Sequence, residues 1–185
     1  MITDAVFVKK LQELRPGQIA TAMVEPLDLD TLYRMTRAAL DNDCYTVFQQ
    51  PYIHMKKLPP VDDTGYPGMA FAIPTRVDDK TFYETAAISP TIKDPRNELF
   101  TMCEQPSPRN VLDFAVQNTK HEFVVFTHHD VYLPKNWGPR FWRAITEAER
   151  RFGPIGVAGV FGVSGDRRKQ RTEAGAVIDQ NGTRA

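Results

Sequence analysis

The feature that most constrains this fold is a short apolar segment that ends in three polar residues. Residues 123–126 read Phe-Val-Val-Phe, and His128, His129 and Asp130 follow after a single threonine. No polar residue alternates within the segment, which is typical of a strand covered on both faces, as in a parallel α/β sheet. Ligands bind such sheets at the carboxyl ends of the strands. The segment therefore predicts a buried strand at residues 122–127 with a candidate site at its end.

The segments around it alternate between strand and helix patterns. Further strands are predicted at residues 69–73, 99–103 and 155–161, with a short hairpin strand at 176–178. Predicted helices run from Asp78 or Asp79 to residue 87, from Ser107 to residue 119, and over residues 139–152. Alternating strands and helices with short connections imply right-handed crossovers and a mostly parallel sheet flanked by helices. The predicted fold class is therefore α/β with a Rossmann-like sheet.

Residues 1–60 follow a different pattern and predict an amino-terminal helical extension of unknown role. The apolar stripes of its two predicted helices are Phe7, Leu11 and Leu14, and then Leu29, Leu32, Tyr33, Thr36 and Leu40. Residues 61–68 contain two glycines and a proline, which predicts a linker. We therefore expect a domain boundary there and a second domain over residues 69–185.

The composition restricts the classes of partner. The chain has 185 residues, and its 23 Lys and Arg balance its 23 Asp and Glu, which argues against a nucleic-acid backbone or an anionic membrane surface as the main partner. The two cysteines, Cys44 and Cys103, form no C-x-x-C pair, so neither a disulfide framework nor a zinc site is indicated. No segment resembles a signal peptide or approaches the roughly 20 apolar residues of a membrane span. We expect a cytoplasmic protein without a membrane span.

Three polar tips follow the first three predicted sheet strands and define the candidate site. They are Pro74, Thr75 and Arg76, then Glu104 and Gln105, and then His128, His129 and Asp130. Because parallel strands end at the same edge of a sheet, we expect these side chains to converge. A carboxylate beside imidazoles at such an edge suits a divalent cation that bridges phosphate oxygens, either Mn²⁺ or Mg²⁺. A His-His-Asp tripeptide by itself is more often a solvated turn, and the buried strand before it favours the metal site.

Two further residues, Arg109 and Asn110, open the helix that precedes strand 122–127. An arginine there can meet a phosphate, and the amino terminus of the helix adds its own positive end. A plain surface arginine is an equally open alternative. Two roles are likewise left open for Glu104: a contact to a base or ribose, and a cap at the entry of the helix. Trp137 and Trp142 are expected to pack in the core.

Five segments, in this order and spacing, resemble the nucleotide-binding half of family 2 type glycosyltransferases of the GT-A fold. The segments are residues 71–86, 99–110, the helix that begins at Arg109-Asn110, 123–137 and 155–162. Glu104-Gln105-Pro106-Ser107 stands where that family has an acidic turn that contacts base and ribose. His128-His129-Asp130 falls on the Asp-x-Asp metal motif, with His128 in place of the first aspartate. The resemblance covers about residues 69–182.

The resemblance implies a protein that transfers a sugar from a nucleotide-diphosphate sugar to an unknown acceptor, which would be a glycan, lipid or protein. It implies that Asp130, with His129, holds a divalent cation (Mn²⁺ or Mg²⁺). The residues that it implies for nucleotide-sugar binding are Pro74, Thr75, Arg76, Glu104, Gln105, Arg109, Asn110 and His128.

One departure from the family pattern leaves an alternative open. The family places its general base, and often another metal-binding histidine, after the fourth strand. Here no histidine follows His129, and the carboxylates in that part are Asp166, Glu173 and Asp179. A base must come within hydrogen-bond reach of the acceptor. The alternative is therefore a non-catalytic nucleotide-binding or scaffold module, as a fragment or half of a split enzyme. A nucleotidyltransferase is disfavoured, because residues 75–78 lack the glycine-rich loop that it would need.

Overall fold

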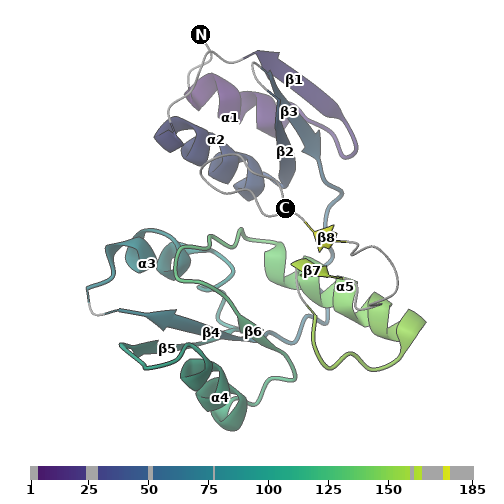
Figure 1. The fold of residues 1–185 in the computed structure, drawn as a ribbon. Coiled ribbons are helices and arrows are strands. Elements are labelled where there is room, and N and C mark those ends of the chain that lie inside the picture. The colour runs from purple at the N-terminus through teal and green to yellow at the C-terminus, as the bar shows by residue number, and fades with distance from the viewer. Residues whose placement is uncertain are drawn as a thin grey trace. The chain divides into compact units, whose positions relative to one another are not determined.

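The structure is a computed structural model that describes residues 4–23, 29–49, 52–76, 78–158, 161–163 and 173–175. Within these residues the fold is mixed α/β, with five α-helices, one 3₁₀ helix and eight strands in three sheets (Figure 1). The chain divides into two compact units, Met1–Trp142 and Arg143–Ala185. Helix α5 (Trp137–Phe152) begins in the first unit and ends in the second.

The first part of unit 1 is an antiparallel sheet with two helices on one side (Figure 1). Across the sheet the strands are β1 (Ile19–Met23), β3 (Tyr52–Lys57) and β2 (Cys44–Gln49), and the helices are α1 (Asp4–Glu13) and α2 (Leu29–Asp41). The buried core between the layers consists of Phe7, Leu11, Ala22, Met35, Ala39, Cys44, Ile53 and Met55. The region predicted as a helical extension therefore also contains three strands.

The apolar stripe predicted for α1 is confirmed at Phe7 and Leu11. The stripe predicted for α2 is wrong at Tyr33, while its members Leu32, Thr36 and Leu40 are partly buried. Phe7 and Leu11 are fully buried. In α2 the buried residues are Met35 and Ala39, whereas Tyr33 is exposed. The prediction gave weight to the large apolar side chains, but the face that packs on the sheet carries Ala39, whose small side chain is completely buried.

The second part of unit 1 is a parallel sheet. Its strands are β5 (Glu98–Cys103), β4 (Ala70–Thr75) and β6 (Val124–Phe126), in the order β5-β4-β6. These are the first three strands that the sequence predicts. The prediction that the strand at 122–127 is buried on both faces is wrong, because Val124 and Val125 of β6 are only partly buried and Phe126 is 42% exposed. The physical reason is that β6 is an outer strand of this three-stranded sheet, whereas β4 is the central one. Residues 70–73 of the central strand β4 are fully buried, as expected for a strand covered on both faces.

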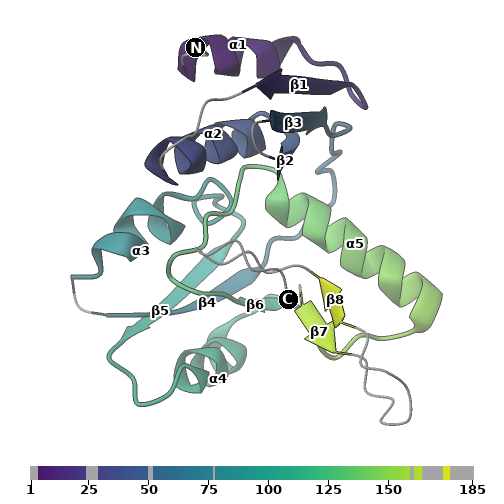
Figure 2. The same cartoon turned by 45° about the horizontal axis from the view of Figure 1, so that its top comes forward.

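Helices cover the two faces of this sheet (Figure 2). Helix α3 (Lys80–Glu84) and the 3₁₀ helix η1 (Ala86–Ile88) contribute Phe82 and Ala86 to a core with Phe71 and Ile73. On the other face, Val111 and Ala115 of α4 (Arg109–Asn118) pack against Ala72. Right-handed crossovers produce this arrangement when successive connections run in opposite directions across the sheet.

The helix predicted at residues 139–152 is confirmed as α5, whereas the fourth strand, predicted at 155–161, is wrong over residues 155–158. Residues 155–158 form no strand, and Val157 is almost fully exposed. Strand β7 (Phe161–Val163) pairs antiparallel with β8 (Glu173–Gly175) and does not join the parallel sheet. Gly156 lies in this segment, and a glycine weakens a strand because it has no side chain to pack. The strand predicted at 176–178 lies outside the described residues.

The apolar stripes that the sequence predicts for α4 and α5 are only partly right. They are Val111, Leu112, Ala115 and Val116, and then Phe141, Ile145, Ala148 and Phe152. Val116 of α4 and Phe152 of α5 are exposed, whereas Val111, Ala115 and Ile145 are buried. Both exposed residues lie near the ends of their helices.

The predicted linker at 61–68 lies in a stretch, residues 58–69, that forms neither helix nor strand. Tyr66 within it is buried and donates a hydrogen bond from its hydroxyl to Asn97 Oδ1 at 2.8 Å. A domain boundary at this stretch stays a prediction. None of the helices in the described ranges is long and apolar enough to cross a membrane.

Candidate functional site

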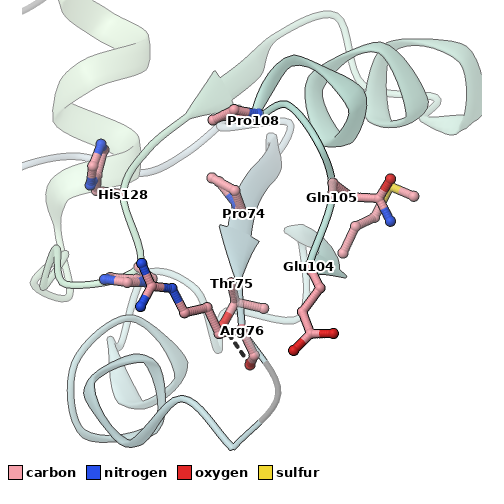
Figure 3. A pocket seen from close by; sticks show the side chains of 9 residues that line it. Pro74, Thr75, Arg76, Glu104, Gln105, Pro108 and His128 are labelled. Atoms are coloured by element: carbon pink, nitrogen blue, oxygen red, sulfur yellow. Dashed lines mark hydrogen bonds between the residues drawn. The ribbon is translucent and has the colours of Figure 1, made fainter.

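A cleft of about 480 Å³ lies where the three parallel strands end (Figure 3). Its lining consists of Pro74, Thr75, Arg76, Met102, Glu104, Gln105, Pro108, His128 and His129. Figure 3 shows Glu104 and Gln105 on one side of the end of β4 and His128 on the other. Of the residues predicted at the three polar tips, all except Asp130 line this cleft.

The order of the strands explains the position of the cleft. Strand β4 is followed along the chain by β5 on one side and then by β6 on the other side. The connection from β4 to β5 and the connection from β5 to β6 therefore run in opposite directions. A reversal of this kind opens a crevice beyond the carboxyl ends of the strands, which is the usual ligand position in open α/β sheets.

The backbone of the cleft is held in an uncommon conformation at Glu104, which has φ of 51°. Its amide N–H donates to the carbonyl oxygen of Thr75 at 3.2 Å, so the turn after β5 is tied to the end of β4. A left-handed conformation costs a residue with a Cβ atom about 1–2 kcal/mol. Such strained residues cluster at functional sites, which agrees with the position of Glu104 in the lining.

The cationic and amide groups of the lining come from different strand ends. Arg76 follows β4 and its side chain is exposed. Gln105 follows β5, donates from Nε2 to the carbonyl oxygen of Cys103 at 3.3 Å, and accepts from Asn110 Nδ2 at 3.3 Å. The cleft therefore offers a positive charge and hydrogen-bonding groups to a polar ligand.

Arg109 and Asn110 do not line the cleft. The Arg109 side chain is 80% exposed and pairs with Asp113, with 3.2 Å between Nε and Oδ2. Asn110 approaches the site only through its bond to Gln105. The structure thus places Arg109 on the exposed surface of α4, as the plain-surface alternative expects.

The side chain of Asp79 is largely buried and contacts two residues that line the cleft, Thr75 and His129. The sequence predicted Asp79, or its neighbour Asp78, only as a helix cap. The cap is confirmed, because Oδ1 accepts from the amide of Phe82 at 3.1 Å. In addition, Oδ2 lies 2.7 Å from His129 Nδ1 and accepts from Thr75 Oγ1 at 3.2 Å. Nothing local in the sequence signals the contact with His129, because the two residues are far apart in the chain.

The surroundings of Asp79 favour its ionised form. Burial raises the pKa of the Asp79 carboxyl, but the hydrogen bonds from Phe82 and Thr75 and the neighbouring His129 imidazole outweigh it, so the pKa lies below its usual value. Only 7% of the Asp79 side chain is exposed, compared with 29% for His129. A largely buried carboxylate with several hydrogen-bond donors is a stable acceptor.

The predicted metal ligands do not form a complete site by themselves. The Asp130 side chain is 57% exposed, and its Oδ1 lies 3.9 Å from His128 Nδ1. The described residues include no group of three His, Cys, Asp or Glu side chains that could hold a metal ion. Protein-bound Mg²⁺ commonly uses one or two carboxylates together with waters and substrate phosphates. This donor set therefore fits a cation only when a bound ligand supplies further oxygens, and joint ligation by His129 and Asp130 stays a prediction.

Comparisons of the chain with protein-family models, with curated proteins and with solved structures find no match. The cleft and the order of the residues that line it are therefore what indicates the function.

Proposed function

We propose that the cleft binds the nucleotide of a nucleotide-diphosphate sugar, and that the chain is a glycosyltransferase-like protein of the GT-A type. The observation that carries this proposal is the cleft at the reversal of strand order, where Arg76, Glu104, Gln105 and His128 come together. Crevices at this point of open α/β sheets bind nucleotides in many proteins. The glycosyltransferase part rests on the resemblance of the segments that carry these residues.

The lining suits the parts of such a donor. Arg76 offers a guanidinium group to the diphosphate, since arginine forms paired hydrogen bonds with phosphate oxygens. Glu104 and Gln105 offer an acceptor and an amide to a ribose or a base. The cation in this proposal is Mn²⁺ or Mg²⁺, shared between the Asp130 carboxylate and the diphosphate, where it would offset the charge of the leaving nucleotide.

Calorimetric titration with UDP and with GDP, each with and without Mn²⁺, tests the proposal directly. We expect binding to at least one of these nucleotides, with an affinity that Mn²⁺ increases. Asp130→Ala should remove the increase caused by Mn²⁺. Failure of both nucleotides to bind a folded chain would contradict the proposal.

A matched pair of arginine variants locates the binding. Arg76→Ala should weaken nucleotide binding by about ten- to a hundredfold, because a hydrogen bond to a charged group contributes about 1.5–3 kcal/mol. Arg109→Ala removes the same charge from outside the lining and should leave the affinity unchanged. Equal losses in the two variants would indicate general electrostatic attraction and not a site in the cleft.

A second candidate is a nucleotide-binding module without transferase activity. The observation that favours it is the position of Asp130, which is more than half exposed and does not line the cleft. Release of UDP or GDP from UDP-glucose or GDP-mannose distinguishes the two candidates. Binding without any release, in the presence of Mn²⁺, would support the module.

A further inference from the structure

We infer that Asp79 is a positioning residue that holds His129 in one tautomer, with the proton on Nδ1 and with Nε2 left as a hydrogen-bond acceptor at the cleft. In this arrangement His129 recognises a ligand that donates a hydrogen bond from a hydroxyl group. The identity of that ligand, a ribose or sugar hydroxyl of the donor, rests on the proposed function. The tautomer itself does not.

The contact between the two side chains determines where the imidazole proton lies. His129 Nδ1 is 2.7 Å from Asp79 Oδ2, which is within the range of a charge-assisted hydrogen bond. An ionised carboxylate only accepts hydrogen bonds, so Nδ1 has to be the donor. In a neutral imidazole the other nitrogen, Nε2, is then unprotonated and can accept.

Asp79 is itself held in place by donors from other parts of the chain. Its Oδ1 accepts from the amide of Phe82 at 3.1 Å, and its Oδ2 accepts from Thr75 Oγ1 at 3.2 Å. These donors come from the first turn of α3 and from the end of β4. Because both oxygens are engaged and the side chain is almost completely buried, the carboxylate cannot turn away from His129 without losing these bonds.

The backbone of His129 is anchored to the same segment of the chain. Thr85 Oγ1 lies 2.8 Å from the carbonyl oxygen of His129 and 2.5 Å from that of Thr81, so its single proton is shared between the two carbonyl groups; Thr85 itself is buried between α3 and η1. The ring and the backbone of His129 are thus both attached to residues 79–85. Two attachments on one side leave the ring a single orientation, which is the requirement for a preorganised binding group.

The neighbouring histidine provides a comparison within the same cleft. The His128 side chain is 78% exposed, and its Nδ1 lies 3.9 Å from Asp130 Oδ1, beyond hydrogen-bonding distance. Both histidines line the cleft, but a buried carboxylate orients only His129 among the contacts that the structure describes. His129 is therefore the residue with a defined acceptor atom, and His128 is free to change rotamer and tautomer.

The direct test is the tautomer of His129, read from the two ring nitrogen shifts in long-range proton–nitrogen NMR spectra at about pH 8, where histidine is ordinarily neutral. We expect Nδ1 to be protonated in the natural chain. In Asp79→Asn the amide oxygen can still cap α3, while the amide nitrogen donates to Nδ1, so the proton should move to Nε2. Asp78→Asn makes the same change at the neighbouring exposed aspartate and should leave His129 unaffected. A natural chain with the proton on Nε2, or an unchanged tautomer in Asp79→Asn, would overturn the inference.

Nucleotide affinity, measured with UDP and GDP in the absence of Mn²⁺ so that metal ligation by His129 does not contribute, tests whether the acceptor atom is used. His129→Asn retains a donor toward Asp79 but lacks Nε2, and we expect it to lower the affinity about tenfold, the loss of one hydrogen bond of about 1.4 kcal/mol. Asp79→Asn should lower the affinity similarly. His129→Gln, which reaches further with its amide oxygen, should recover part of the loss. Unchanged affinity in His129→Asn would overturn the role in recognition.

The two proposals fail in different ways. If neither nucleotide binds while His129 carries its proton on Nδ1, the proposed function is wrong and the positioning by Asp79 stands. If a nucleotide binds while the proton lies on Nε2, the proposed function stands and the positioning is wrong.

Discussion

The two three-stranded sheets of unit 1 differ in the direction of their strands and in how they are covered. The antiparallel sheet has α1 and α2 on one face, and β3 accordingly alternates between buried Ile53 and Met55 and more exposed neighbours. The parallel sheet has helices on both faces, and β4 is buried without alternation over residues 70–73. The parallel sheet brings the carboxyl ends of its three strands to one edge, and the polar tips gather there into a cleft.

The difference also determines what a side chain in each sheet contributes to stability. Ile19, Met23 and Tyr45 of the antiparallel sheet are more than half exposed. Phe71 and Ile73 of the parallel sheet are completely buried and pack in a core with α3 and η1. We therefore expect truncation of Phe71 or Ile73 to have a larger effect than truncation of these three exposed side chains.

The largest effect is expected for Phe71→Ala. Its ring is fully buried and lies 6.2 Å from the ring of Trp137, so truncation should lower the free energy of unfolding by about 3–5 kcal/mol. The matched control is Tyr45→Ala in the antiparallel sheet, which should cost less than about 1 kcal/mol because Tyr45 is 56% exposed. Urea denaturation of both variants measures the difference. Similar losses would show that the exposed face of the antiparallel sheet is covered in the folded protein.

A pair of glycines makes the next comparison. Gly17 and Gly68 precede β1 and β4, and both have positive φ, 81° and 85°. A Cβ atom at Gly68 would overlap the carbonyl group of Arg96, whereas one at Gly17 would meet open space. Gly17→Ala should cost about 1–2 kcal/mol from backbone strain. In Gly68→Ala the steric overlap adds about 1–3 kcal/mol to this strain. The free energy of unfolding should therefore fall by about 2–5 kcal/mol in denaturation experiments. Equal costs would contradict the close approach at Gly68.

We expect the stability of the folded chain to depend on pH because of the Asp79 carboxylate. Because the pKa of Asp79 is lowered in the folded state, its stabilising contribution is present above the unfolded pKa of about 3.9 and is lost as the pH falls through the folded pKa. Asp79→Asn should therefore be less stable than the natural chain at neutral pH, and the difference should shrink below about pH 4. Thermal unfolding at neutral pH and below about pH 4 measures this difference in stability, with Asp78→Asn as the control. A difference that stays constant with pH would contradict the ionised state of Asp79.

The smallest effect is expected at the exposed ion pair on α4. Arg109 and Asp113 are four residues apart, and their side chains are 80% and 51% exposed. Arg109→Ala should change the free energy of unfolding by no more than about 0.5 kcal/mol, a change that should disappear in high salt. A loss above about 1 kcal/mol would place Arg109 in a tighter network than the structure describes.

Local patterns in the sequence were sufficient to predict several elements. The apolar runs before Thr75, Glu104 and His128 predicted the three parallel strands, although only β4 is buried without alternation. The polar residues at their ends predicted the members of the cleft, except Asp130, and the sequence left the cap of α3 open between Asp78 and Asp79, of which the structure shows Asp79.

Only the tertiary structure decided which of these residues meet. It decided the strand order β5-β4-β6, the three antiparallel strands in residues 19–57, and the absence of Arg109 and Asp130 from the lining. It also brought Asp79 against His129, although the sequence presents one as a helix cap and the other as a member of the metal motif. The physical reason is that a local pattern states which face of an element is buried, whereas the partner of a polar side chain depends on how α3 and the loop after β6 pack on the sheet.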